Sequence, residues 1–263
     1  TQTGTMVLSG DKVYAVHQSL GLLIIDTASD KVVGTVKHDD YVYGSVVKSK
    51  DGMLWLSTTL ADGTAQPFIV RLDPATGKTK NIDIPKDIYA PANSWFAWTP
   101  DCFCASAKEN CLYWNGGESS WTSNQSIFKY DIDANSFSQI INLAKDDPNY
   151  YIYGASCRVH PQTDQLYIGM TIGAWSNKTV ERIYDNTGKK LNEYQLKENY
   201  WFPSIPVFPE SGPSDGIETG TAATATRTLT ARYTIDGKRI SSPQRGINIL
   251  HYSDGTTKKV IVK

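Results

Sequence analysis

The stretch SWFAWTPDCFCASAKENCLYW, residues 94–114, decides the fold. It begins with an aromatic cluster, continues through a short apolar run, turns at Lys108–Asn110 and leaves in a second apolar run that ends at Trp114. Short runs rich in aromatic and β-branched residues, separated by turn residues, predict β-strands joined as a hairpin. Because the same plan recurs three more times along the chain, the sequence predicts a series of antiparallel sheets.

Each repeat can be written as four short strands, and an Asp closes the third strand of each, at positions 26, 73, 131 and 185. An Asp at such a corner accepts hydrogen bonds from the backbone amides of the following turn, so we interpret these four carboxylates as structural. A repeat of roughly 40–50 residues with four strands is typical of a β-propeller blade. The sequence therefore predicts an all-β fold with a β-propeller of four blade-like repeats.

Four blades are few for a propeller, and an unclosed fan would expose sheet edges. We therefore expect the repeats to be the C-terminal part of a larger propeller, in a chain that was processed or trimmed, because it starts at Thr1 without a Met. The alternative is that the proline-rich segment Trp201–Phe208 closes a ring of four blades.

The predicted domains are propeller blades over residues 1–210, a linker over 211–226 and a small C-terminal β-sandwich over 227–263. The linker is rich in Ser, Gly, Thr and Ala. Asp236–Gly237 and Asp254–Gly255 separate alternating runs in the last segment, which predicts hairpins.

Charge and composition exclude several classes of protein. A net charge of −1 leaves no electrostatic footprint for nucleic acid. No apolar run approaches the roughly 20 residues of a membrane helix, so we expect no transmembrane segment. The four cysteines, Cys102, Cys104, Cys111 and Cys157, lack the paired spacing of a zinc site. Cys104 and Cys111 flank a tight turn and could form a disulfide across it; buried thiols are the plainer interpretation.

Four segments resemble an uncharacterised family of Bacteroidetes cell-surface propellers related to the YncE-like group. They are the opening stretch, IFKYDID (127–133), YIYGASCRVHP (151–161) and YWFPSIPVFP (200–209), and the resemblance covers roughly residues 41–209. It implies an exported propeller of the cell envelope. Some relatives are encoded beside outer-membrane cobalamin or glycan uptake systems, which implies ligand capture and an outer-membrane uptake protein as a partner. Family members usually carry more sequence before the first repeat, in agreement with truncation.

The last segment, residues 233–263, resembles the C-terminal sorting-type domain of Bacteroidetes secreted proteins. The shared features are an Asp-Gly-Lys turn at 236–238, a Gly-Ile-Asn-Ile strand at 246–249 and a basic and apolar terminus. This resemblance implies export or surface attachment and no chemistry of its own.

Propellers bind ligands where the loops before each blade gather with the loops between its second and third strands, and here these loops are aromatic. The predicted ligand-binding residues are Tyr41, Trp95, Trp121, Tyr150, Tyr151, Trp175, Tyr200 and Trp201. Aromatic faces with scattered Asp and Asn suit sugars, corrin-like rings and other flat amphipathic ligands. Packing of some of these rings between blades is the alternative.

No catalytic motif is recognisable, and the four histidines show no metal-ligand spacing. The carboxylate pairs Asp39–Asp40 and Asp146–Asp147 could serve a glycosidase, but adjacent carboxylates point apart on an extended chain. The sequence therefore favours a non-catalytic protein that binds a small molecule or glycan, with no cofactor that can be named. A protein-interaction or adhesion platform is the alternative, and a metal-assisted hydrolase or lyase is a third hypothesis.

Overall fold

The structure is a computed structural model of the 263-residue chain. It describes residues 3–62, 64–88, 103–115, 125–174, 176–195, 208, 228–253 and 256–262. The chain forms two compact units, Thr1–Phe208 and Pro209–Lys263.

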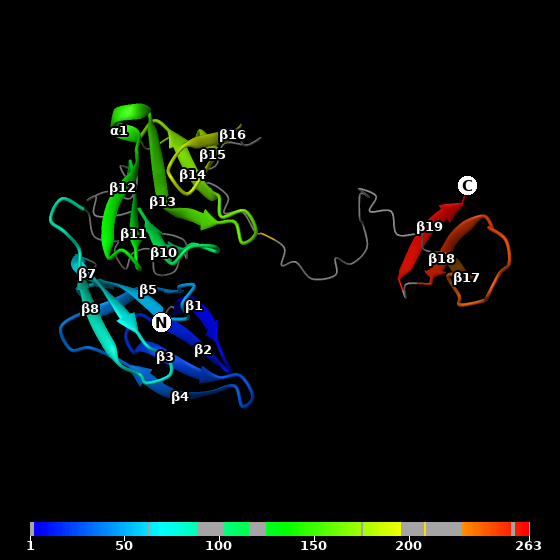
Figure 1. The fold of residues 1–263 in the computed structure, drawn as a ribbon, viewed down its shortest axis with the longest axis horizontal. Helices are drawn as coiled ribbons and strands as arrows, with labels where there is room; N and C mark the ends of the chain where they lie inside the picture. The colour runs from blue at the N-terminus through cyan, green and yellow to red at the C-terminus, as the bar shows by residue number, and fades with distance from the viewer. Residues whose placement is uncertain are drawn as a thin grey trace. The chain divides into compact units, whose positions relative to one another are not determined.

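The first unit contains four antiparallel sheets, each of four strands paired in chain order (Figure 1). Sheet 1 comprises β1 (Thr3–Ser9), β2 (Lys12–His17), β3 (Gly21–Asp26) and β4 (Lys31–Val36). Sheet 2 comprises β5 (Val42–Lys48), β6 (Leu54–Thr59), β7 (Ala65–Leu72) and β8 (Thr79–Asp83). Sheet 3 comprises β9 (Phe103–Ala105), β10 (Cys111–Trp114), β11 (Ser126–Asp131) and β12 (Ser136–Asn142). Sheet 4 comprises β13 (Tyr150–Val159), β14 (Leu166–Ile172), β15 (Thr179–Tyr184) and β16 (Lys190–Gln195), and the short helix α1 (Leu143–Asp146) precedes it.

The predicted role of the corner aspartates is confirmed. The Oδ1 atoms of Asp26, Asp73, Asp131 and Asp185 each accept a hydrogen bond of 2.9 Å from a backbone amide of the turn that follows. These contacts satisfy amides that the strand ladder leaves unpaired, so one residue type fixes the same corner in all four sheets.

Three apolar cores hold consecutive sheets face to face. The core between sheets 1 and 2 contains Leu54 and Leu56 of β6, whereas Trp55, between them, belongs to the core shared by sheets 2 and 3. A third core joins sheets 3 and 4 through residues such as Tyr113 and Ile168. Strand alternation thus gives the middle sheets two buried faces.

The first strands of the four sheets adjoin in order, with β5 in contact with both β1 and β9, and β9 in contact with β13. Stacked four-stranded meanders whose first strands lie together are the arrangement of propeller blades, so the all-β, propeller-like prediction is confirmed. The number of blades in a closed ring stays a prediction, since the segment 201–207 lies outside the described residues.

The second unit shows one antiparallel sheet in the order β17 (Leu229–Thr234), β18 (Gly246–Tyr252) and β19 (Thr257–Val262). Over residues 228–253 and 256–262 this is a single layer, so the predicted sandwich stays a prediction. Within the described parts of both units, no helix is long and apolar enough to cross a membrane.

Candidate functional site

We call one end of each sheet the leading end. It is the end at which the first strand begins, and antiparallel pairing brings the loop between the second and third strands to the same end. Tyr41 directly precedes β5, and Tyr150 and Tyr151 open β13. The other predicted residues, Trp95, Trp121, Trp175, Tyr200 and Trp201, lie outside the described residues.

Tyr41 lies in an aromatic cluster at the leading end of sheet 2. The imidazole of His38 stacks on its ring at a centroid distance of 3.9 Å and an interplanar angle of 13°. Tyr43 and Phe68 meet the same ring edge-on, at 5.9 and 5.1 Å. Burial raises the pKa of Tyr41, although hydrogen bonds to Asn81 and Tyr43 counteract it. The Tyr41 side chain is half-buried while that of His38 is 43% exposed, so this stack borders solvent.

Tyr150 lies at the leading end of sheet 4, where its ring covers the guanidinium of Arg182 at 3.5 Å from the ring centroid. This distance is well inside the range of a cation–π interaction. Tyr151 is half-buried beside it and pairs with Thr171 across the sheet. The contacts between described residues do not join either tyrosine to Tyr41, so the structure shows two separate aromatic groups.

Arg182 is the centre of a buried polar network that the sequence analysis missed. It is 1% exposed, and its Nε donates to Glu193 Oε2 at 2.7 Å while Nη1 donates to Asp147 Oδ2 at 2.8 Å. Burial alone would lower the pKa of Arg182, but hydrogen bonds to Tyr184, Glu193 and Asp147 raise it above its ordinary value. The available signal was an Arg in the middle of the strand TVERIY (β15), together with the acidic pair at 146–147.

This network determines what two of the candidate residues do. Asp147, considered as one half of a glycosidase pair, forms an ion pair with Arg182 and connects the loop before β13 to β15. The ring of Tyr150 covers the same guanidinium, so at least one of its faces is occupied within the protein. The Tyr41–His38 stack instead borders solvent through His38, whose side chain is 43% exposed.

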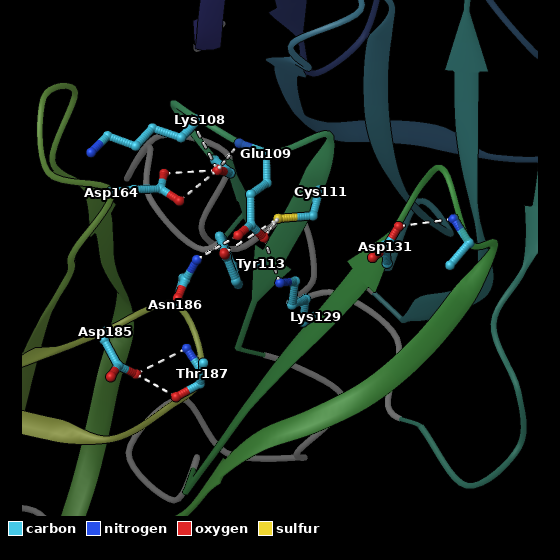
Figure 2. A network of polar contacts seen from close by, with 12 residues as sticks. Lys108, Glu109, Cys111, Tyr113, Lys129, Asp131, Asp164, Asp185, Asn186 and Thr187 are labelled. Atoms are coloured by element: carbon cyan, nitrogen blue, oxygen red, sulfur yellow. Dashed lines mark hydrogen bonds and ion pairs between the residues drawn. The ribbon is translucent and has the colours of Figure 1, made fainter.

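A second polar network lies at the opposite end of sheets 3 and 4 (Figure 2). Asp164, 4% exposed, accepts from Ser106 Oγ and the Ala107 amide, each at 2.7 Å. Glu109 accepts from Lys129 Nζ at 2.8 Å and from Asn186 Nδ2 at 2.7 Å. Every one of these carboxylates has donors from a neighbouring turn or strand, so we interpret the network as a structural joint between the two sheets.

Among the described side chains, no group of three His, Cys, Asp or Glu residues is placed to hold a metal ion. An open groove on the second unit is lined by Leu229–Arg232 and Arg239–Ser241, none of which is a predicted ligand-binding residue.

The sequence model of the DUF5074 family, a domain of unknown function, matches residues 1–209, and the chain belongs to this family. No curated protein matches the sequence. A crystal structure of TolB from Acinetobacter baumannii is similar at a TM-score of 0.51 and 14% identity, over 98% of this chain and 53% of that one. Because the identity is low, the likeness to this β-propeller concerns the fold alone.

Two crystal structures of the extracellular domain of BT4673 from B. thetaiotaomicron are also similar. They align at TM-scores of 0.48 and 0.47 and 16% identity, over 74% and 76% of this chain. The chain spans 24% of the length of each of these structures and about half of TolB.

Proposed function

We propose that this member of the DUF5074 family is an exported, non-catalytic propeller-like protein that binds a small ligand or glycan through aromatic residues at the leading ends of its sheets. The observation that supports the proposal is the Tyr41–His38 stack, a flat pair of rings that borders solvent at the leading end of sheet 2. Such rings present an apolar face and a polar edge, which suits the faces of sugars and other flat amphipathic molecules.

The finer parts of the proposal rest on the resemblances in the sequence. They are the Bacteroidetes YncE-like origin, a sorting-type domain over residues 227–263 and association with an outer-membrane system for cobalamin or glycan uptake. Within this proposal the predicted tryptophans at 95, 121 and 175 complete the binding face together with Tyr200 and Trp201.

The first experiment is a thermal-shift screen of the full chain against glycans, corrinoids and divalent metal ions. A ligand that binds only the folded state raises the apparent melting temperature by mass action. We expect a shift from an organic ligand; a shift produced only by a metal ion would instead support the metal-assisted enzyme.

The ligand found in the screen then tests the site. We expect Tyr41→Ala to weaken its binding about three- to tenfold by calorimetry, because an aromatic contact contributes about 0.5–1.5 kcal/mol beyond area burial. Tyr194→Ala is the matched control, since Tyr194 is 51% exposed but lies on the outer strand β16. Unchanged affinity in Tyr41→Ala would contradict the site.

A protein-interaction platform is the second candidate, and exposed apolar residues on sheet 1 favour it. Met6, Leu8 and Val32 are 61%, 57% and 56% exposed, far more than the apolar residues buried in the three cores. Exposed apolar groups that gather on one face are typical of protein contact surfaces. No thermal shift with any small ligand, combined with capture of a partner that Met6→Lys abolishes, would support this role.

A further inference from the structure

Two thiols from different sheets meet in the core between sheets 3 and 4. Cys104 lies on β9 and Cys157 on β13, strands that contact each other, and their Sγ atoms are 3.6 Å apart. We propose that Cys104 and Cys157 form a reversible disulfide that links sheet 3 to sheet 4 when the protein is in an oxidising compartment. The sulfur atoms have to approach by roughly 1.5 Å to reach the length of a disulfide bond.

The structure favours this pair over the hairpin pair Cys104–Cys111 that the sequence suggested. Cys104 lies opposite Tyr113 in the register of β9 and β10, so Cys111 is displaced by two residues along the neighbouring strand. The Cys111 thiol is instead 3.3 Å from the Tyr113 hydroxyl (Figure 2). A Cys104–Cys111 disulfide is therefore disfavoured.

The different exposures of the two residues suggest an order for the reaction. Cys104 is half-buried, whereas Cys157 is 0% exposed, so we assign the first attack to Cys104. The Cys104 thiolate attacks a small-molecule disulfide or an oxidised dithiol oxidoreductase, which forms a mixed disulfide and releases one carrier thiol. The Cys157 thiolate then attacks Cys104 Sγ, forms the protein disulfide and releases the second carrier thiol. Two protein thiols are oxidised and one carrier disulfide is reduced to two thiols.

The expected consequence is a stability that depends on redox state. The disulfide would close a loop between residues 104 and 157 and so reduce the conformational freedom of the unfolded chain. The folded state would change little, because the two sulfurs are already close. Because a loop of this size is long, we expect the oxidised protein to melt roughly 5–10 °C above the reduced one.

Mass spectrometry of the full chain tests the proposal directly. The folded protein is equilibrated in oxidised glutathione, alkylated under denaturing conditions and digested with trypsin. We expect a mass loss of about 2 Da, since two hydrogens leave, and a cross-link between peptides 87–108 and 146–158. Peptide 87–108 also contains Cys102, so the cross-link must persist in Cys102→Ser and disappear in Cys104→Ser.

Controls separate the disulfide from a packing effect. Cys111→Ser should keep both the cross-link and the melting shift, whereas Cys157→Ser should lose both, with the reduced forms of each compared in dithiothreitol. Four alkylated cysteines after oxidation of the wild-type chain, or a cross-link that maps to Cys102 or Cys111, would overturn the proposal. Fragment ions of the cross-linked wild-type peptides assign the linked sulfur to Cys102 or Cys104, so the proposal is decided whether or not a serine variant folds.

Discussion

Glu181 and Arg182 are neighbours in β15, yet alternation places their side chains on opposite faces of sheet 4, in opposite electrostatic surroundings. Arg182 is surrounded by acceptors. Glu181 is only 8% exposed, and across the described residues neither of its carboxylate oxygens has a hydrogen-bond partner. Burial raises the pKa of Glu181 to about 8. A buried carboxyl without donors keeps its proton, because the charged form is poorly solvated.

The raised pKa of Glu181 makes stability depend on pH with a definite sign. The folded state keeps the proton up to about pH 8, whereas the unfolded chain releases it near the ordinary value of 4.5. The free energy of unfolding contributed by this group is therefore fully present below pH 4.5 and is lost as the pH rises to about 8. We expect Glu181→Gln to remove this loss and to stabilise the protein at pH 9 by on the order of 5 kcal/mol.

Urea unfolding of the wild type and of Glu181→Gln at pH 5 and pH 9 measures the effect. Asp83→Asn, at an exposed carboxylate that ends β8, is the matched control and should leave the pH dependence unchanged. Equal pH dependence in the wild type and in Glu181→Gln would show that the carboxyl is ionised in the folded protein.

Gly188 and Gly77 occupy the same position in two Thr-Gly-Lys turns, but only at Gly188 would an added side chain meet another sheet. Both have positive φ, +89° and +71°. A Cβ on Gly188 would lie 1.9 Å from the carbonyl oxygen of Ile140 on β12, whereas one on Gly77 meets nothing within 4 Å. We expect Gly77→Ala to cost about 1 kcal/mol of unfolding free energy and Gly188→Ala at least about 2–3 kcal/mol. Denaturant titration compares them; equal losses would mean that β12 moves away freely.

At the scale of elements, the ion pair between Asp147 and Arg182 connects the loop before β13 to β15. We expect Asp147→Ala to lower the unfolding free energy by about 1–2 kcal/mol, because a buried guanidinium loses an acceptor while the lost carboxylate was itself partly exposed. Asp146→Ala removes the adjacent carboxylate and should have little effect, which makes it the control in thermal unfolding. If both variants melt alike, Arg182 does not depend on Asp147.

Local features of the elements could be predicted from the sequence, while contacts between elements could not. The corner aspartates and the strand order follow from turn chemistry and alternation, which act within a few residues. The stacking of Tyr150 on Arg182 and the approach of Cys104 to Cys157 depend on how one sheet packs on another, and periodicity carries no information on that. For the same reason, the register of β9 against β10 corrects the suggested Cys104–Cys111 pair.

At the scale of the whole first unit, the sheets differ in how completely they are covered. Val46 of β5 pairs with Leu56 and is 1% exposed, because sheet 1 packs on that face of sheet 2. Met6 and Leu8 are two residues apart in β1 and so share a face of sheet 1, yet they are 61% and 57% exposed. Sheet 1 thus has an exposed apolar face, whereas the face of sheet 2 that carries Val46 is covered by a neighbouring sheet.

This difference predicts how charges on the two faces act. We expect the double variant Met6→Lys/Leu8→Lys to change the free energy of unfolding by less than about 0.5 kcal/mol, since exposed positions tolerate charge. Val46→Lys should prevent folding, because it buries an unpaired ammonium group.

In sedimentation velocity, the wild-type chain should associate weakly as its concentration rises, and the double variant Met6→Lys/Leu8→Lys should stay monomeric, because exposed apolar faces drive association. Identical sedimentation of both proteins over the same concentrations would mean that this face is not an association surface.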